Sequence, residues 1–187
     1  LLDDTRDGAA SGSQAAGWLI AGDFGSGKSH LLEYLAHLAL ERNFVCSKVV
    51  VSKETPLHDP VKLYRAAIAG AVVPGRQGAA LTEVAASLNP AGAGFADLRD
   101  WAAAEAGVGL EPDGAAAVGP PSRRKAPGAG LNSRFPATML LWERVTDPEV
   151  RDRIVSFWSG DPLGVGDLRS WLRAHGQAGA YPLETVR

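Results

Sequence analysis

The sequence has only one cysteine, Cys46, which excludes a disulfide framework and any metal cluster built from several cysteines. It also lacks an excess of either charge, because 19 basic and 21 acidic residues leave a net charge of −2. No basic surface for nonspecific binding to nucleic acid is therefore predicted. Apolar runs are short, and none approaches the roughly 18 residues that a membrane-spanning helix needs. The acidic start of the chain does not resemble a secretion signal, so we expect a protein of the reducing cytoplasm.

Methionine is scarce as well, since Met139 is the only one and the chain has no initiator. We therefore expect the chain to be trimmed or to be a piece of a longer protein. What is present favours a folded core, because 45% of the residues are hydrophobic and 21% are charged, as in ordinary globular proteins.

Residues 17–52 follow the pattern of a strand, a glycine loop, a helix and a second strand. The apolar run 18–21 suits a buried strand, and residues 28–42 have the spacing of polar side chains that is typical of an amphipathic helix. Asn43 suits the left-handed position after that helix. Residues 44–52 are rich in valine, which favours a strand. This order predicts the opening of a P-loop-type parallel α/β sheet.

The rest of the chain predicts helices around a loop. Asp59-Pro60 is the N-cap and first-turn pair that begins a helix, and residues 95–106 predict another. Residues 107–130 are rich in glycine, proline and alanine, which predicts a mobile loop. Three short amphipathic helices are expected at 135–145, 148–158 and 167–175. Their tryptophans, Trp142, Trp158 and Trp171, fall at packing positions and are interpreted as core rather than as a ligand site.

We accordingly expect an α/β fold class, with a P-loop NTPase-type parallel sheet in the N-terminal part and an α-helical insertion or subdomain. The expected divisions are an irregular lead-in or fraying helix (1–16), a nucleotide-binding α/β core (17–73), a helix with the mobile loop (74–134) and a helical subdomain (135–187). Sheets of this kind have about five strands. Because only two strands are evident, we expect an incomplete domain, the nucleotide-binding front end of a larger protein.

A phosphate-binding loop is the strongest functional signal. The run Gly22-Asp23-Phe24-Gly25-Ser26-Gly27-Lys28-Ser29 fits the pattern G-x-x-x-x-G-K-[ST]. Its three glycines permit backbone angles closed to other residues, and successive N–H groups can then surround a phosphate oxygen at the positive end of the next helix. Lys28 would reach the β- and γ-phosphates, and the Ser29 hydroxyl would ligate Mg²⁺. The adjacent His30 completes the predicted nucleotide site.

The residue that would drive hydrolysis is not evident. Phosphoryl transfer to water needs an acidic residue at the end of an apolar strand, to hold Mg²⁺ and position the water. The valine-rich segment ends at Ser52 instead. Glu54 just beyond it and Glu143 after an apolar run are weak candidates, with a solvated loop charge and a helix residue as the respective alternatives. No catalytic residue is therefore assigned.

Other polar residues carry weaker signals. His30 and His37 fall on the solvated stripe of the first predicted helix, without a partner at metal-ligand spacing. Cys46 lies in a predicted buried strand and is interpreted as inert. The basic cluster 123–125 is too short to predict a nucleic-acid surface.

Four segments together resemble the ATP-binding proteins of bacteriophage-exclusion (BREX) defence systems, a bacterial P-loop ATPase family. They are residues 22–30, 40–45 (Leu-Glu-Arg-Asn-Phe-Val), 52–57 (Ser-Lys-Glu-Thr-Pro-Leu) and 157–163 (Phe-Trp-Ser-Gly-Asp-Pro-Leu). The resemblance covers most of residues 17–175 and is weakest over 70–130. It implies an AAA-like ATPase fold, with Gly22, Gly25, Gly27, Lys28 and Ser29 as the site for ATP and Mg²⁺.

The resemblance also implies other defence-system proteins as partners and ATPase activity in the full-length protein. Members of this family are expected to carry the acidic strand beyond a helical region like 135–175, and this chain has no recognisable Walker B acid. Two alternatives stay open: another P-loop phosphotransferase or a GTPase, and a nucleotide-binding interaction module that does not hydrolyse. No Asn-Lys-x-Asp guanine motif is present. The sequence leaves the oligomeric state open.

Overall fold

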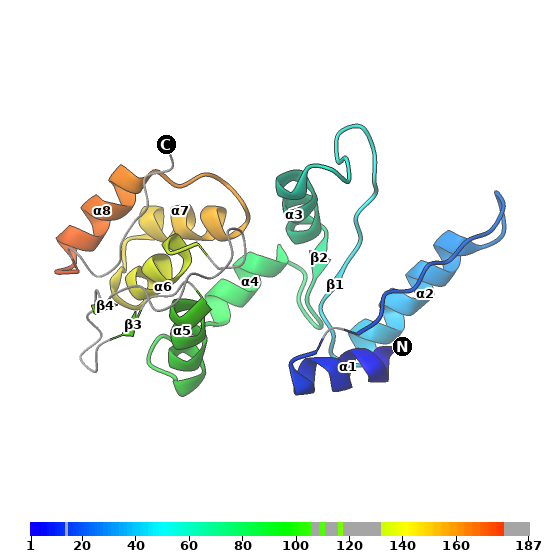
Figure 1. The fold of residues 1–187 in the computed structure, drawn as a ribbon, viewed down its shortest axis with the longest axis horizontal. Helices are drawn as coiled ribbons and strands as arrows, with labels where there is room; N and C mark the ends of the chain where they lie inside the picture. Colours follow the sequence, from blue (N-terminus) through cyan, green and yellow to red (C-terminus); the bar gives the residue numbers. More distant parts are fainter. Residues whose placement is uncertain (14, 106–108, 111–115, 118–131, 178–187) are drawn as a thin grey trace.

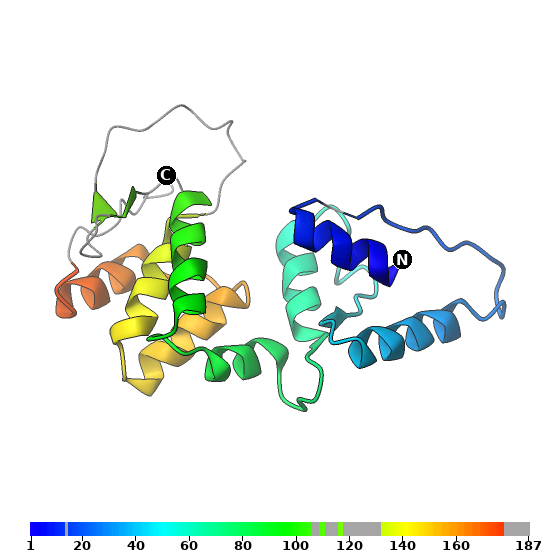
Figure 2. The ribbon, with the colours of Figure 1, turned by 90° about the horizontal axis from the view of Figure 1, so that it is seen from below.

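A computed structural model describes residues 1–13, 15–105, 109–110, 116–117 and 132–177. Its helices are α1 (Leu2–Ser11), α2 (Lys28–Glu41), α3 (Pro60–Ala69), α4 (Ala80–Ser87), α5 (Ala93–Glu105), α6 (Arg134–Arg144), α7 (Pro148–Trp158) and α8 (Val165–Ala174). Its strands are β1 (Cys46–Ser47), β2 (Ala71–Val72), β3 (Gly109–Leu110) and β4 (Ala116–Ala117). Figures 1 and 2 show α1, α2 and α3 at one end of the molecule, α5 to α8 at the other, and α4 between them.

The expectation of a parallel P-loop sheet is wrong for this structure. The described residues are mostly helical, and their four short strands form two antiparallel pairs, β1 with β2 and β3 with β4. Of the predicted strand 44–52, only Cys46 and Ser47 are paired. The predicted strand 18–21 has no strand partner in the described part of the chain, and Leu19 is 95% exposed.

The physical reason lies in what a strand needs. Apolar and β-branched side chains favour an extended backbone, but a strand becomes stable only when a neighbour pairs its N–H and C=O groups and covers a face. In this structure Ser47 pairs with Ala71 and Cys46 with Val72, and no further strand continues the ladder among the described residues. Residues 18–21 therefore have the side chains that favour a strand, but no neighbouring strand pairs with them in the described part of the chain.

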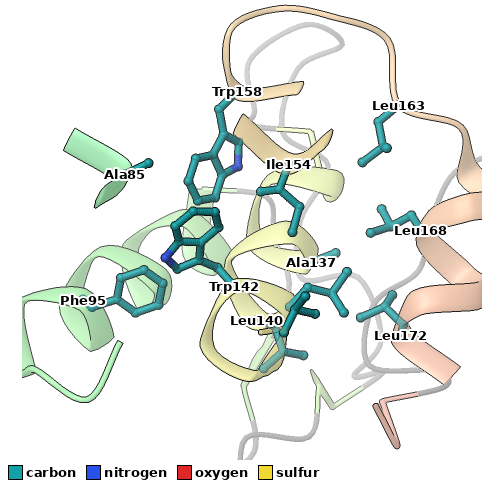
Figure 3. Packing of buried hydrophobic residues seen from close by; sticks show 12 residues of the cluster. Ala85, Phe95, Ala137, Leu140, Trp142, Ile154, Trp158, Leu163, Leu168 and Leu172 are labelled. Carbon is teal, nitrogen blue, oxygen red and sulfur yellow. The ribbon is translucent and has the colours of Figure 1, made fainter. Parts of the chain in front are cut away.

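The hydrophobic core lies in the C-terminal helices. Leu140 and Leu141 of α6, Ile154 of α7 and Leu168 of α8 are all 1% exposed or less. Figure 3 shows the α8 leucines pointing toward α6. At the other end, α2 buries only Ala39 and α3 buries no residue. The three predicted helices at 135–145, 148–158 and 167–175 are confirmed as α6, α7 and α8.

Trp142 and Trp158 lie in this core, as the sequence predicted, and the third tryptophan, Trp171, packs against it partly buried. The ring centroids of Trp142 and Trp158 lie 5.1 Å apart, and the ring planes are tilted by 45°. Figure 3 shows the two side chains next to each other. The indole N–H of Trp158 donates to Oγ1 of Thr138 at 2.9 Å, and that hydroxyl donates to the carbonyl of Phe135. Thr138 is fully buried, so these bonds satisfy polar groups that water cannot reach.

Helix boundaries follow local signals. Asp59 caps α3 by accepting from the backbone N–H of Lys62, and Pro60 occupies its first turn, as predicted. Asp147 caps α7 in the same way. Asn43, with a φ of 64°, adopts the predicted left-handed conformation after α2. Over residues 1–16, where a lead-in or a fraying helix was expected, the structure has α1.

Other predictions fall on residues that the structure does not describe. The predicted mobile loop 107–130, including the basic cluster 123–125, lies outside the described residues except for β3 and β4. No helix in the described part of the chain is long and apolar enough to cross a bilayer.

Candidate functional site

The predicted phosphate loop is a tight turn that leads directly into α2. The backbone N–H of Ser26 donates to the carbonyl of Asp23 at 3.2 Å, and α2 begins at Lys28. Gly25 and Gly27 have φ values of 80° and 84°, in the left-handed region that L side chains rarely adopt. Glycine is therefore favoured at both positions, because it adopts this conformation without strain.

Lys28 folds back over the loop that precedes it. Its ammonium group donates to the carbonyl oxygens of Gly22 at 2.7 Å and Asp23 at 2.6 Å, and to Oγ of Ser26 at 3.2 Å. A lysine ammonium has three donors, so these three acceptors account for all of them. The same cation could turn toward a phosphate, which would replace neutral acceptors with charged ones.

At Gly22 an added side chain would meet a neighbouring side chain, whereas the backbone angle itself imposes no strain. A Cβ added there would lie 2.7 Å from Oγ of Ser26 and 3.9 Å from Cδ of Lys28. A side chain at position 22 would therefore push Ser26 away and disturb the lysine's contacts. The three glycines of the motif thus have two different physical roles.

The N-terminus of α2 is open for an anion. Its N-cap is Gly27, which offers no side-chain hydrogen bond, and the first turn contains no acidic residue. The first N–H groups of a helix have no partner within the helix, and they carry partial positive charge. Ser29 in that turn is exposed, as are His30 and the predicted loop residues Asp23 and Phe24. The structure thus brings residues 22–30 together at one end of α2.

The two candidate catalytic acids, Glu54 and Glu143, each pair with a residue outside the loop. Glu143 lies on α6, as its helical interpretation predicted, and pairs with Arg99 of α5 at 2.7 Å. Figures 1 and 2 place α6 at the end of the molecule away from the start of α2. Glu54 accepts a hydrogen bond from the Ser52 hydroxyl at 2.7 Å, which lowers the pKa of its carboxyl. Each carboxylate thus already has a partner away from the loop.

No sequence motif marks the hollow that lies beside α2. A groove of about 510 Å³ runs between α2 and the β1–β2 pair, lined by Leu32, Ala36 and Val72 among others. Cys46 borders it, and burial raises the pKa of its thiol, which agrees with the interpretation of an unreactive cysteine. Glu33 at its edge pairs with Lys48, which lowers the pKa of that carboxyl.

Comparison with protein families gives one match. The sequence profile of the family described as "BREX system ATP-binding protein BrxC/D" matches residues 2–88. This confirms the resemblance to BREX ATP-binding proteins over that segment, which contains the loop, α2, β1 and α3. Helices α5 to α8 lie outside the match. Comparisons with curated proteins and with solved structures found no match.

Proposed function

We propose that this protein, whose residues 2–88 match the family described as BREX system ATP-binding protein BrxC/D, binds the phosphates of ATP with residues 22–29. The observation that carries the proposal is the loop itself. Two glycines hold left-handed angles, an uncapped helix begins directly after them, and Lys28 lies over the turn. These features together present N–H donors and one cation to a small anion.

Binding would exchange the partners of Lys28. The ammonium would leave the carbonyl oxygens of Gly22 and Asp23 and contact the β- and γ-phosphates, where charge-assisted hydrogen bonds are roughly twice as strong as neutral ones. The hydroxyl of Ser29, one residue further along α2, would ligate Mg²⁺. That ion would neutralise charge between the phosphates.

The test is ATP binding with Mg²⁺ by calorimetry, comparing the original chain with Lys28→Ala. Loss of charge-assisted contacts is expected to cost about 1.5–3 kcal/mol, or roughly 10- to 150-fold in Kd. Lys62→Ala is the matched control, because Lys62 is an exposed lysine on α3 that pairs with Asp59. Equal losses in the two variants, or no loss in either, would refute the proposal.

We further propose that the nucleotide state controls contacts with other proteins of the defence system. The family match supports this partner class, and the structure offers a mechanical link between the matched segment and the C-terminal helices. Tyr64 of α3 donates to the carbonyl of Trp158 at 2.6 Å, and Arg65 donates twice to the carbonyl of Gly160. Co-purification of the defence proteins with and without ATP tests this step. Recovery that is identical in both conditions would contradict it.

A further inference from the structure

An aromatic-lined cavity of about 580 Å³, widely open to solvent, lies where α3 meets the C-terminal helices. Its walls come from segments that are far apart in sequence: Val61 and Tyr64 of α3, Trp101 of α5, Phe135 and Met139 of α6, and Phe157 of α7. Pockets that take small molecules are typically about 300–1,000 Å³ and are mainly apolar and aromatic. The size and the lining are therefore those of a small-molecule site.

The phenol and the carboxylate of the walls are already paired within the protein. The hydroxyl of Tyr64 donates to the carbonyl of Trp158, and burial raises the pKa of this phenol, which keeps it neutral. The carboxylate of Asp161, the one ionisable acid that lines the described cavity, pairs with Arg65 at 3.3 Å. No unpaired charged side chain lines the described cavity, so a charged ligand would gain no ion pair from its apolar walls to offset the loss of its water.

The apolar lining favours a ligand that contains a flat aromatic ring. Phe135 and Phe157 pack with ring centroids 4.9 Å apart and a tilt of 42°, the arrangement in which aromatic groups attract one another. Met139 adds a flexible and polarizable wall that adapts to the shape of a ligand. A ring system could thus contact both aromatic side chains and sulfur.

The cavity is held in shape before any ligand enters. Besides the bond from Tyr64 to Trp158, the guanidinium of Arg65 donates to the carbonyl of Gly160 at 3.0 and 2.8 Å. These bonds fix α3 against the end of α7, and Gly160 itself lines the cavity. A preformed site avoids part of the ordering cost of binding. We propose that this cavity binds an uncharged aromatic small molecule, separately from the nucleotide loop.

The experiment uses the fluorescent probe N-phenyl-1-naphthylamine with the original chain and with Val61→Trp. Val61 is 54% exposed on the lip of the cavity, so a larger side chain can fill the opening without straining the core. Val50→Trp is the matched control, because Val50 is 70% exposed and does not line the cavity. We expect saturable binding of one probe per chain, at least tenfold weaker in Val61→Trp and unchanged in Val50→Trp.

Three results would overturn the proposal. The first is an absence of saturable binding, and the second is an equal effect of the two valine substitutions, which would place the probe elsewhere. The third is a probe signal that falls as the chain dimerises, which would assign the cavity to a second copy. A second probe, 8-anilinonaphthalene-1-sulfonate, adds a negative charge to the same ring system. It should bind this site at least tenfold more weakly, and equal affinity would refute the requirement for an uncharged ligand.

Discussion

Replacing Gly27 with alanine tests whether the conformation of the loop determines ATP affinity. Gly27 has a φ of 84°, and a Cβ added there would have no atom within 4 Å, so the substitution acts through the backbone and not through a clash. An L residue in this region costs roughly 1–2 kcal/mol. If ATP binds the left-handed form, that strain should appear in binding as about a 5- to 30-fold rise in Kd.

The matched control is Gly75→Ala. Gly75 also has a positive φ, 69°, and an added Cβ there would likewise have no atom within 4 Å. It lies in the turn between β2 and α4, so the same strain should lower stability without affecting the loop. Gly27→Asn should be milder than Gly27→Ala, because asparagine tolerates left-handed angles better.

Calorimetric titration with Mg-ATP measures the three affinities, and circular dichroism checks that helix content is retained. We expect Kd to rise most in Gly27→Ala, less in Gly27→Asn and not at all in Gly75→Ala. If Gly27→Ala and Gly75→Ala bind ATP equally well, the left-handed turn is not part of the binding conformation. An equal loss in both would instead mean that affinity follows overall stability.

Three further predictions concern contacts within the fold. Thr138→Val removes the acceptor of the Trp158 indole and should lower the free energy of unfolding by about 1–3 kcal/mol in urea titrations. The loss should be smaller in a Trp158→Phe background, and equal losses would exclude the bond as the cause. Glu143→Gln weakens the ion pair with Arg99 and should lower the free energy of unfolding by about 1–2 kcal/mol. The affinity for ATP should stay unchanged, and a loss of affinity would indicate that Glu143 acts at the nucleotide. Because burial raises the pKa of Cys46, iodoacetamide should alkylate this thiol more slowly at pH 8 in the folded chain than in urea, and equal rates would contradict its burial.

The helices were predictable because their signals are local. Asp59 and Pro60 mark the start of α3 through a cap and a fixed φ, and Asn43 marks the end of α2 through its tolerance of left-handed angles. The tryptophans of α6 and α7 were assigned to the core from spacing alone, and Trp142 and Trp158 are 5% and 7% exposed. Such signals depend on residues within one or two helical turns, so the helices can be predicted without knowledge of the tertiary packing.

The strands were not predictable because pairing is non-local. Val50 and Val51 have the β-branched side chains of a strand, yet they are exposed and unpaired in this structure, while Ala71 and Val72, which carried no strand prediction, pair with β1. The turn 22–27 behaves differently. Gly25, Gly27 and Lys28 form it from contacts within six residues, so the turn is defined locally although the expected sheet does not form.

Neither the helix signals nor the turn pattern could predict the cavity beside α3, because its walls come from distant parts of the sequence. Tyr64 and Trp158 are 94 positions apart and belong to elements that looked unrelated in sequence, one in the expected nucleotide-binding core and one in the helical subdomain. Their hydrogen bond nevertheless links the segment that matches the BREX family to the bundle that does not. If ATP alters the position of α3, the resulting strain reaches α7 through this bond and through Arg65 at Gly160. A ligand in the cavity would act on the same contacts, so its affinity and that of ATP should depend on each other reciprocally.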